Sequence, residues 1–208
     1  MQEIFRNIWA GLAGSRPLDL VNLVLGVAGV GLMVRRSLWA FPVGLMAVTT
    51  QGVLFWQAKF YADATVQLFF FGGLLYGWWY WLWGRGVAPE LPITFLSWRS
   101  RGAVLALVAA GTAGWAMVEA RYTDSPMPWR DAFIAIFSVA GQMLQSRKNL
   151  ENWPVWIAVN LVAIASYWKA ELAFSAFLYT IYLLLAVAGW RAWCRAMENQ
   201  RSEIGEAS

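Results

Sequence analysis

The chain has 208 residues, of which 60% are apolar and only 13% are charged, and its mean hydropathy is +0.49. A soluble domain carries about 25% charged residues, so this chain has too few charges to cover a water-facing surface. It has no histidine and one cysteine, Cys194, which excludes a disulfide framework, a histidine or cysteine metal site and a catalytic triad that needs imidazole. The composition predicts an all-α integral membrane protein that is not an enzyme and holds no cofactor.

Seven apolar runs approach the roughly 20 residues that a helix needs to cross a bilayer. Before them, residues 3–13 have one apolar helical face and are expected to lie in the membrane interface. The polar residues after Arg195 are expected to fray into water. Very short turns are expected at Lys59–Asp63 and Lys169–Glu171. The predicted spans are residues 19–34, 38–58, 63–83, 102–120, 129–146, 153–169 and 171–193.

The basic residues predict the orientation of these spans. Ten lysines and arginines lie on the side that holds the C-terminus, and six lie on the other side. Because basic residues accumulate on the cytoplasmic side, the C-terminus is expected to be cytoplasmic and the N-terminus external. The net charge of +4 thus reads as a topology signal and not as a nucleic-acid-binding surface.

An internal repeat appears when the chain is aligned with itself at an offset of 112. Residues 19–81 then match residues 131–193 without a gap, and 15 of the 63 positions are identical. The matches include Asp19 with Asp131, Pro42 with Pro154, and the pattern Gly-Trp-x-x-Trp that ends both segments. Chance similarity between membrane helices would supply mostly alanine, leucine and valine matches.

The repeat predicts two parallel three-helix units joined by a linker helix, a 3+1+3 arrangement with the substrate site between the units. The expected organisation is an N-terminal interfacial segment (1–18), a first bundle (19–83), a linker with the fourth span (84–128), a second bundle (129–193) and a polar tail (194–208). We call residues 19–83 the first half and residues 129–193 the second half. The linker helix is expected only to connect them.

Polar and aromatic side chains follow single helical faces within the spans, and such groups are expected to face a cavity in the bundle. The alternative is hydrogen bonding between helices, which is favoured for Ser138 and Ser175. Ligand contact is favoured for Asn160 and Gln67. Trp79, Tyr80, Trp83 and Trp193 are expected to be interface anchors. The faces comprise Ser138, Gln142 and Gln145; Trp153, Trp156 and Asn160; Ser175, Tyr179 and Tyr182; and Asn22, Gln51 and Gln67 with Phe70, Phe71 and Trp78.

Ionisable residues are expected only at span ends. Asp63, Asp131 and Glu171 begin spans, where a carboxylate meets the positive end of the helix dipole, and Glu119 closes the fourth span. The cavity wall is therefore expected to hold amides and indoles but no titrating group. Since proton-coupled carriers keep an ionisable relay in the membrane, the pattern indicates a uniporter.

Two stretches resemble the Pnu vitamin transporters, in particular the PnuC branch of nicotinamide riboside transporters. One runs from Trp56 through Gln67 and Phe69–Phe71 to Trp81, and the other is Arg147-Lys148-x-x-Glu151-Asn152-Trp153-x-x-Trp156-x3-Asn160. The resemblance implies a SWEET-like 3+1+3 fold and facilitated diffusion of a vitamin across the bacterial inner membrane, followed by trapping through phosphorylation in the cytoplasm.

The resemblance also implies site residues. Trp153, Trp156 and Asn160 carry over as substrate contacts, with Gln67 and the Phe69–Phe71 run as the facing wall. Phe41, Gly44 and Val48 stand where the repeat would place that motif in the first half, so the site is expected to be asymmetric. The substrate-binding set predicted from face and resemblance together is Trp153, Trp156, Asn160, Gln67, Phe71, Gln142, Tyr179 and Tyr182.

Alternatives remain at this point. The expected partners are the lipid bilayer and a small vitamin, with nicotinamide riboside first and thiamine, riboflavin or another vitamin of the family as the alternative. A seven-helix receptor or photosensor is disfavoured, because a retinal protein needs a lysine in mid-membrane and Lys169 lies at a span end. The sequence leaves open whether the chain forms a homo-oligomer.

Overall fold

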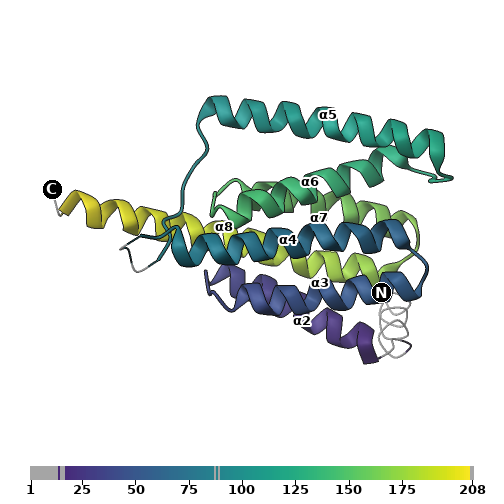
Figure 1. The fold of residues 1–208 in the computed structure, drawn as a ribbon, viewed down its shortest axis with the longest axis horizontal. Coiled ribbons are helices and arrows are strands. Elements are labelled where there is room, and N and C mark those ends of the chain that lie inside the picture. The colour runs from purple at the N-terminus through teal and green to yellow at the C-terminus, as the bar shows by residue number, and fades with distance from the viewer. Residues whose placement is uncertain (1–13, 15–16, 87, 89, 207–208) are drawn as a thin grey trace.

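The computed structural model describes residue 14, residues 17–86, residue 88 and residues 90–206 (Figure 1). The interfacial segment expected at 3–13 lies outside these residues. The described part of the chain is helical, apart from its turns and one isolated bridge between Thr94 and Asn149. Its helices are α2 (Pro17–Val34), α3 (Ala40–Gln57), α4 (Tyr61–Trp83), α5 (Trp98–Tyr122), α6 (Pro128–Ser146), α7 (Asn152–Lys169) and α8 (Ala173–Glu206).

The helix boundaries lie within about two residues of the predicted spans, except that α5 begins four residues before the predicted 102 and α8 extends past the predicted 193. The two turns expected to be very short connect α3 to α4 and α7 to α8. The expectation that the chain frays after Arg195 is wrong, because α8 continues as one helix to Glu206. Alanine, methionine, glutamate, glutamine and arginine dominate residues 195–201, and these are good helix formers that need no apolar partner.

Six of the helices pack into a closed ring, and the seventh lies outside it. Along the chain, α2 packs on α3 and α3 on α4, and α6 packs on α7 and α7 on α8. Contacts between α4 and α6 and between α2 and α8 close the ring, while α5 packs on α6 from outside. Consecutive helices run in opposite directions (Figure 1). The turns therefore gather at two ends of the bundle.

Three helices of the described chain are long and apolar enough to cross a membrane by length and composition alone: α2, α5 and residues 173–200 of α8. The other four, α3, α4, α6 and α7, have 18 to 23 residues. Three exposed tryptophans lie at helix ends, as expected of interface anchors: Trp56, Trp83 and Trp168 are between 60% and 66% exposed.

The backbone repeats at the same offset as the sequence. Helices α3 and α7 have bounds that differ by 112 at both ends. The described non-glycine residues with positive φ form two pairs at that offset, Arg36 with Lys148 and Lys59 with Glu171. The amides of Ser37 and Asn149 bond back to Leu32 and Leu144, which closes the same helix-ending turn in each half. The sequence repeat is thus a structural repeat.

An aromatic cluster fills the end of the bundle where α2, α4, α6 and α8 finish or emerge. Trp81 meets Phe41 edge to face at 5.1 Å between ring centroids, and Trp193 meets Trp153 in the same way at 5.3 Å. These pairs are equivalent under the repeat. Gly77 and Gly189, also equivalent, make room for them, since a Cβ at Gly77 would lie 2.7 Å from the Phe41 ring and one at Gly189 would overlap the Trp153 ring.

The cluster corrects one prediction. Trp193 was expected to anchor the chain at the membrane interface, but its side chain is completely buried. Trp79 and Trp83, which were assigned the same role, are exposed. Helical rotation separates them, because Trp79 and Trp83 lie on the outer face of α4 whereas Trp193 faces the ring interior beside Trp81.

The segment between α4 and α5 crosses this end of the bundle and is bound there by Lys148. The Lys148 side chain is 1% exposed and donates to the carbonyl of Leu91. Its ammonium lies 3.2 Å from Glu90 and 4.5 Å from the centre of the Trp81 ring. Arg36, the repeat equivalent of Lys148, also pairs with Glu90 at 3.5 Å. A basic side chain from each half therefore forms an ion pair with Glu90.

Candidate functional site

The ring encloses a cavity of about 1210 Å³ that is lined by residues from all seven described helices. At one end it stops on the aromatic cluster, because Met33, Leu74 and Trp153 belong to both the cluster and the cavity wall. We call this end the floor. A cavity of this size exceeds the roughly 300–1,000 Å³ of typical small-molecule sites, so a drug-sized solute fits inside.

The motif of α7 lies on the cavity wall near the floor. Trp153, Trp156 and Asn160 share one face of the helix, as the spacing predicts, and all three line the cavity. Asn160 is 5% exposed, and its side chain forms no hydrogen bond with any residue that the structure describes. The Nε1–H of Trp153 is also buried without a partner among these residues. Buried polar groups are nearly always hydrogen-bonded, so both groups have hydrogen-bonding capacity that the described chain does not use.

Helix α6 supplies the neighbouring wall. Gln145 accepts the Nε1–H of Trp156 at 2.9 Å, which fixes the indole plane against the cavity. Gln142 donates to Ser146 at 3.3 Å, and its carbonyl oxygen stays available. Ser138 was expected to bond between helices, but it lines the cavity and makes no hydrogen bond within the described chain. The same holds for Ser175 on α8.

Two tyrosines of the predicted set extend the wall toward the other end. Tyr179 and Tyr182 line the cavity, and Tyr179 lies between Tyr182 and Tyr167, with ring centroids 5.9 Å and 5.2 Å away. Gly26 of α2 makes room for the Tyr182 hydroxyl, because a Cβ there would overlap it. The Tyr182 hydroxyl therefore contacts α2, a helix of the first half.

The first half contributes amides to the wall. Asn22, Gln51 and Gln67 all line the cavity, together with Phe69 and Phe70. Phe71, in contrast, is not part of the wall and is 38% exposed, so its inclusion in the predicted set is wrong. The reason is helical rotation, since a step of one residue from Phe70 turns the side chain by about 100° and out of the ring. Trp78 is likewise absent from the wall.

Four carboxylates line the end opposite the floor, which we call the mouth: Asp19, Asp63, Glu119 and Asp131. The prediction of a wall without titrating groups is therefore wrong. These residues do lie at helix ends, as expected, but the cavity reaches far enough to include them. Asp19 and Asp131 were already paired by the sequence repeat, and that pairing was the available signal. Trp115 and Glu119 show in addition that α5 does more than connect the halves.

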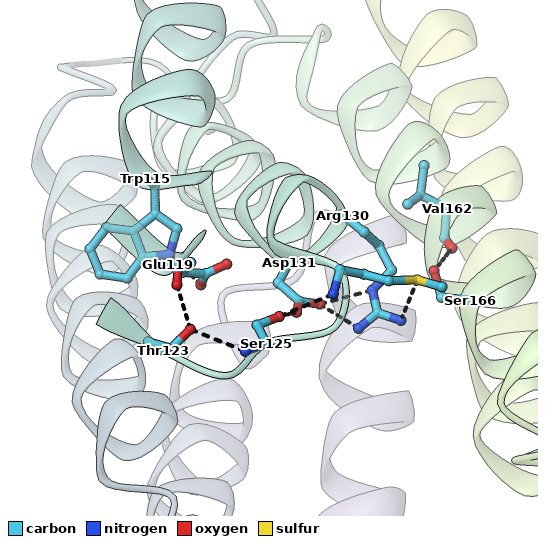
Figure 2. A network of polar contacts seen from close by, with 9 residues as sticks. Trp115, Glu119, Thr123, Ser125, Arg130, Asp131, Val162 and Ser166 are labelled. Carbon is cyan, nitrogen blue, oxygen red and sulfur yellow. Dashed lines mark hydrogen bonds and ion pairs between the residues drawn. The ribbon is translucent and has the colours of Figure 1, made fainter. Parts of the chain in front are cut away.

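A hydrogen-bond network holds two of these carboxylates in place (Figure 2). Asp131 accepts from Ser125 at 2.7 Å and pairs with Arg130, also at 2.7 Å. Glu119 accepts the Nε1–H of Trp115 at 2.7 Å. The charges of Asp63 and Asp131 interact with each other and with Glu119. The Arg130 guanidinium offsets part of this charge.

The chemistry available in the cavity is binding. In the described chain no three histidine, cysteine, aspartate or glutamate side chains lie close enough to hold a metal ion, so the mouth carboxylates do not form a metal site. Indole and phenol rings offer stacking surfaces, and the amides offer donors and acceptors for a polar edge. The arrangement suits an aromatic ring that carries hydrogen-bonding groups.

Comparison with known proteins agrees with this geometry. A family-level sequence match, described as "Nicotinamide mononucleotide transporter", covers residues 16–195. The riboflavin/roseoflavin transporter RibM of Streptomyces davaonensis is 34% identical over 84% of this chain and 83% of its own length. The nicotinamide riboside transporter PnuC of Escherichia coli K12 is 25% identical over 97% of this chain and 96% of its own.

A solved structure shares the fold. The crystal structure of the vitamin B3 transporter PnuC superposes with a TM-score of 0.73, covering 94% of this chain and 90% of that one, at 19% identity. With a family match across most of its length and transporters as its relatives, the chain belongs to the nicotinamide mononucleotide transporter (PnuC) family and is a membrane transporter.

Proposed function

We propose that this protein carries nicotinamide riboside across the bacterial inner membrane by facilitated diffusion. The observation that carries the proposal is the unpartnered Asn160 beside the Trp153 and Trp156 indoles in a cavity of about 1210 Å³. A nicotinamide ring can stack on an indole while its carboxamide bonds to the Asn160 side chain, which then gains a hydrogen-bond partner that it lacks within the described chain.

The charge of the mouth favours this substrate. Nicotinamide riboside carries a pyridinium cation, and four carboxylates line the cavity at its entrance: Asp19, Asp63, Glu119 and Asp131. A cavity lined by one sign of charge concentrates the opposite ion and raises its rate of entry. The cationic vitamin thiamine would gain equally from this field, whereas the neutral isoalloxazine ring of riboflavin would not.

Riboflavin is the second candidate because of the relationship to RibM, which is 34% identical. The cavity volume accommodates the larger flavin ring, and its ribityl chain presents hydroxyls as a riboside does. The two vitamins share a planar ring and a five-carbon polyhydroxylated part. The wall of indoles and amides suits that common chemistry.

The transport cycle follows from the two halves. With α2–α4 and α6–α8 as parallel units of a 3+1+3 bundle, rocking of one half against the other would open the floor while closing the mouth. The distribution of basic residues supports an orientation with the floor and the C-terminus on the cytoplasmic side. Phosphorylation in the cytoplasm would then trap the vitamin. No charged side chain lies beside Asn160 at mid-depth in the described wall, which supports uniport.

The test is exchange of labelled vitamin in liposomes that contain the purified protein. Labelled nicotinamide riboside should equilibrate without an ion gradient, and excess unlabelled nicotinamide riboside should compete more effectively than thiamine or riboflavin. Exchange that requires a proton or sodium gradient would refute uniport. Preferential competition by riboflavin would establish the second candidate, and failure of all three vitamins to exchange would refute the proposal.

A further inference from the structure

The first half of the chain carries a hydrogen-bonded pair of amides on the cavity wall that neither the family motif nor the relatives explain. The side-chain N–H of Asn22 on α2 donates to the side-chain carbonyl of Gln51 on α3. Both residues line the cavity. Asn22 lies on the second turn of α2, and Gln51 lies six residues before the end of α3, so the pair sits between the mouth and mid-depth.

The pair leaves one donor and one acceptor unused. Each amide has a carbonyl oxygen and an NH2 group, and the mutual bond uses one group of each. The Asn22 oxygen and the Gln51 NH2 make no further hydrogen bond to any described part of the chain. Exchanging the oxygen and nitrogen of both amides would still leave one donor and one acceptor. A hydroxyl group, which both donates and accepts, matches this pair.

A third amide lies next to the pair. Gln67 of α4 packs on Gly52, the neighbour of Gln51, because a Cβ at Gly52 would lie 3.5 Å from the Gln67 Cβ. Gln67 also lines the cavity and forms no hydrogen bond within the described chain. Three consecutive helices therefore present uncharged hydrogen-bonding groups at one level of the wall. A single bond between Asn22 and Gln51 would be enough to join α2 to α3, so the remaining groups are not needed for helix packing.

The repeat shows that these amides are specific to the first half. The equivalents of Asn22, Gln51 and Gln67 in the second half are Ile134, Ala163 and Tyr179. Conversely, the equivalents of Trp156 and Asn160 in the first half are Gly44 and Val48. The two halves thus carry complementary sets, with rings and Asn160 toward the floor on one wall and three amides nearer the mouth on the other.

We propose that Asn22 and Gln51 form a subsite for the hydroxyl groups of the transported vitamin's five-carbon part, and so determine specificity for a vitamin with that part intact. The inference rests on the proposed function, since it assumes a ligand whose ring binds near Trp153, Trp156 and Asn160. The chain of hydroxyls then points toward the mouth and bonds to the wall of the first half. Gln67 lies within the same subsite.

The test is a cycle of two variants and hydroxyl-deleted ligands. Binding of nicotinamide riboside and of its 2′-, 3′- and 5′-deoxy analogues is measured by calorimetry for the wild type, Asn22→Leu and Gln51→Met. We expect each variant to bind the riboside about tenfold more weakly, the equivalent of one hydrogen bond. For the wild type, at least one deoxy analogue should bind about tenfold more weakly than the riboside. For the variant, that analogue and the riboside should bind equally well.

The matched control is Gln57→Met, which changes an exposed glutamine on the same helix outside the cavity wall and should bind every ligand as the wild type does. If the loss of binding free energy in the variant and the loss caused by the missing hydroxyl add for all three analogues, the amide pair only joins α2 to α3 and the proposal is overturned. Unchanged binding by both variants would also overturn it. If the wild-type protein binds none of these ligands, the proposed function fails. The subsite is then tested by the same cycle with riboflavin and lumiflavin, which has a methyl group in place of the ribityl chain.

Discussion

The indole rings of Trp81 and Trp193 lie 5.9 Å apart between centroids, although 112 residues separate them in the chain. Each donates its Nε1–H across to the opposite half: Trp81 to the carbonyl of Ser146 at 3.1 Å, and Trp193 to that of Met33 at 3.2 Å. Both acceptors are carbonyls in the last turn of the first helix of a half, where carbonyls lack the usual amide partner four residues later. The two halves are therefore joined at the floor by one bond in each direction, from equivalent tryptophans to acceptors that differ by one position under the repeat.

This close packing predicts the effect of enlarging a glycine. Gly189→Ala should lower the free energy of unfolding by about 1–3 kcal/mol, because the new Cβ overlaps the Trp153 ring and the buried indole cannot move aside. Binding should weaken as well, since Trp153 lines the cavity. Thermal unfolding in detergent and calorimetry measure the two effects. Gly72→Ala is the control, because nothing lies near its Cβ position, and equal melting temperatures for the two variants would contradict the packing argument.

Asn160 should matter for binding more than for folding. Asn160→Ala removes a side chain that is 5% exposed but has no hydrogen-bond partner in the described chain, so no protein group is left unpaired. We expect vitamin affinity to fall by at least about tenfold, while the elution volume and melting temperature stay near those of the wild type. Wild-type affinity in this variant would mean that the α7 face serves helix packing alone.

The mouth should select by charge. In Asp63→Asn combined with Glu119→Gln, two carboxylates at the cavity mouth become neutral. The initial uptake rate of nicotinamide riboside should fall several-fold at low ionic strength, and the difference should shrink in about 0.15 M salt, where screening acts over roughly 8 Å. Riboflavin uptake should not change. Asp124→Asn, an exposed carboxylate between α5 and α6 outside the cavity wall, is the control. An equal loss for both vitamins would argue against electrostatic selection.

Lys148 should make stability depend on pH. Burial lowers the pKa of Lys148 below its ordinary value of 10.5, and this effect outweighs the opposing charge of Glu90. Between the lowered pKa and 10.5 the unfolded chain binds more protons than the folded chain, so the free energy of unfolding rises with pH. The melting temperature of the wild type relative to Lys148→Met should therefore increase as the pH is raised from about 7 to about 10. A difference that stays constant with pH would show that the buried ammonium keeps its ordinary pKa.

The helices could be predicted from the sequence because their signals are local. The lengths of the apolar runs, the short polar turns between them and the repeat offset of 112 predict the boundaries of α3 and α7 to within two residues. The face containing Trp153, Trp156 and Asn160 also follows from helical spacing alone. The end of α8 could not be predicted in this way, because polarity marks where a membrane span stops and not where a helix stops.

Two errors at the site have one physical origin. A run such as Phe69–Phe71 is apolar all round, so its sequence does not indicate which ring faces inward, and Phe71 turned out to lie outside the cavity wall. Trp193 looked like an interface anchor because it lies at a predicted span end, yet it is buried against Trp81 and Trp153. In both cases the rotation of the helix against its neighbours, which depends on distant residues, decides the outcome.

The sequence by itself determined the membrane class, the seven helices, the repeat and the α7 motif, because each is set by composition or by spacing along one helix. Only the tertiary structure decided that the carboxylates beginning α4 and α6 and ending α5 line one cavity with the amides of α2 and α3. Those groups lie far apart in the chain, and only closure of the ring through α2–α8 and α4–α6 contacts brings them to one space. Their combined charge and hydrogen-bonding capacity is thus a property of the packed bundle.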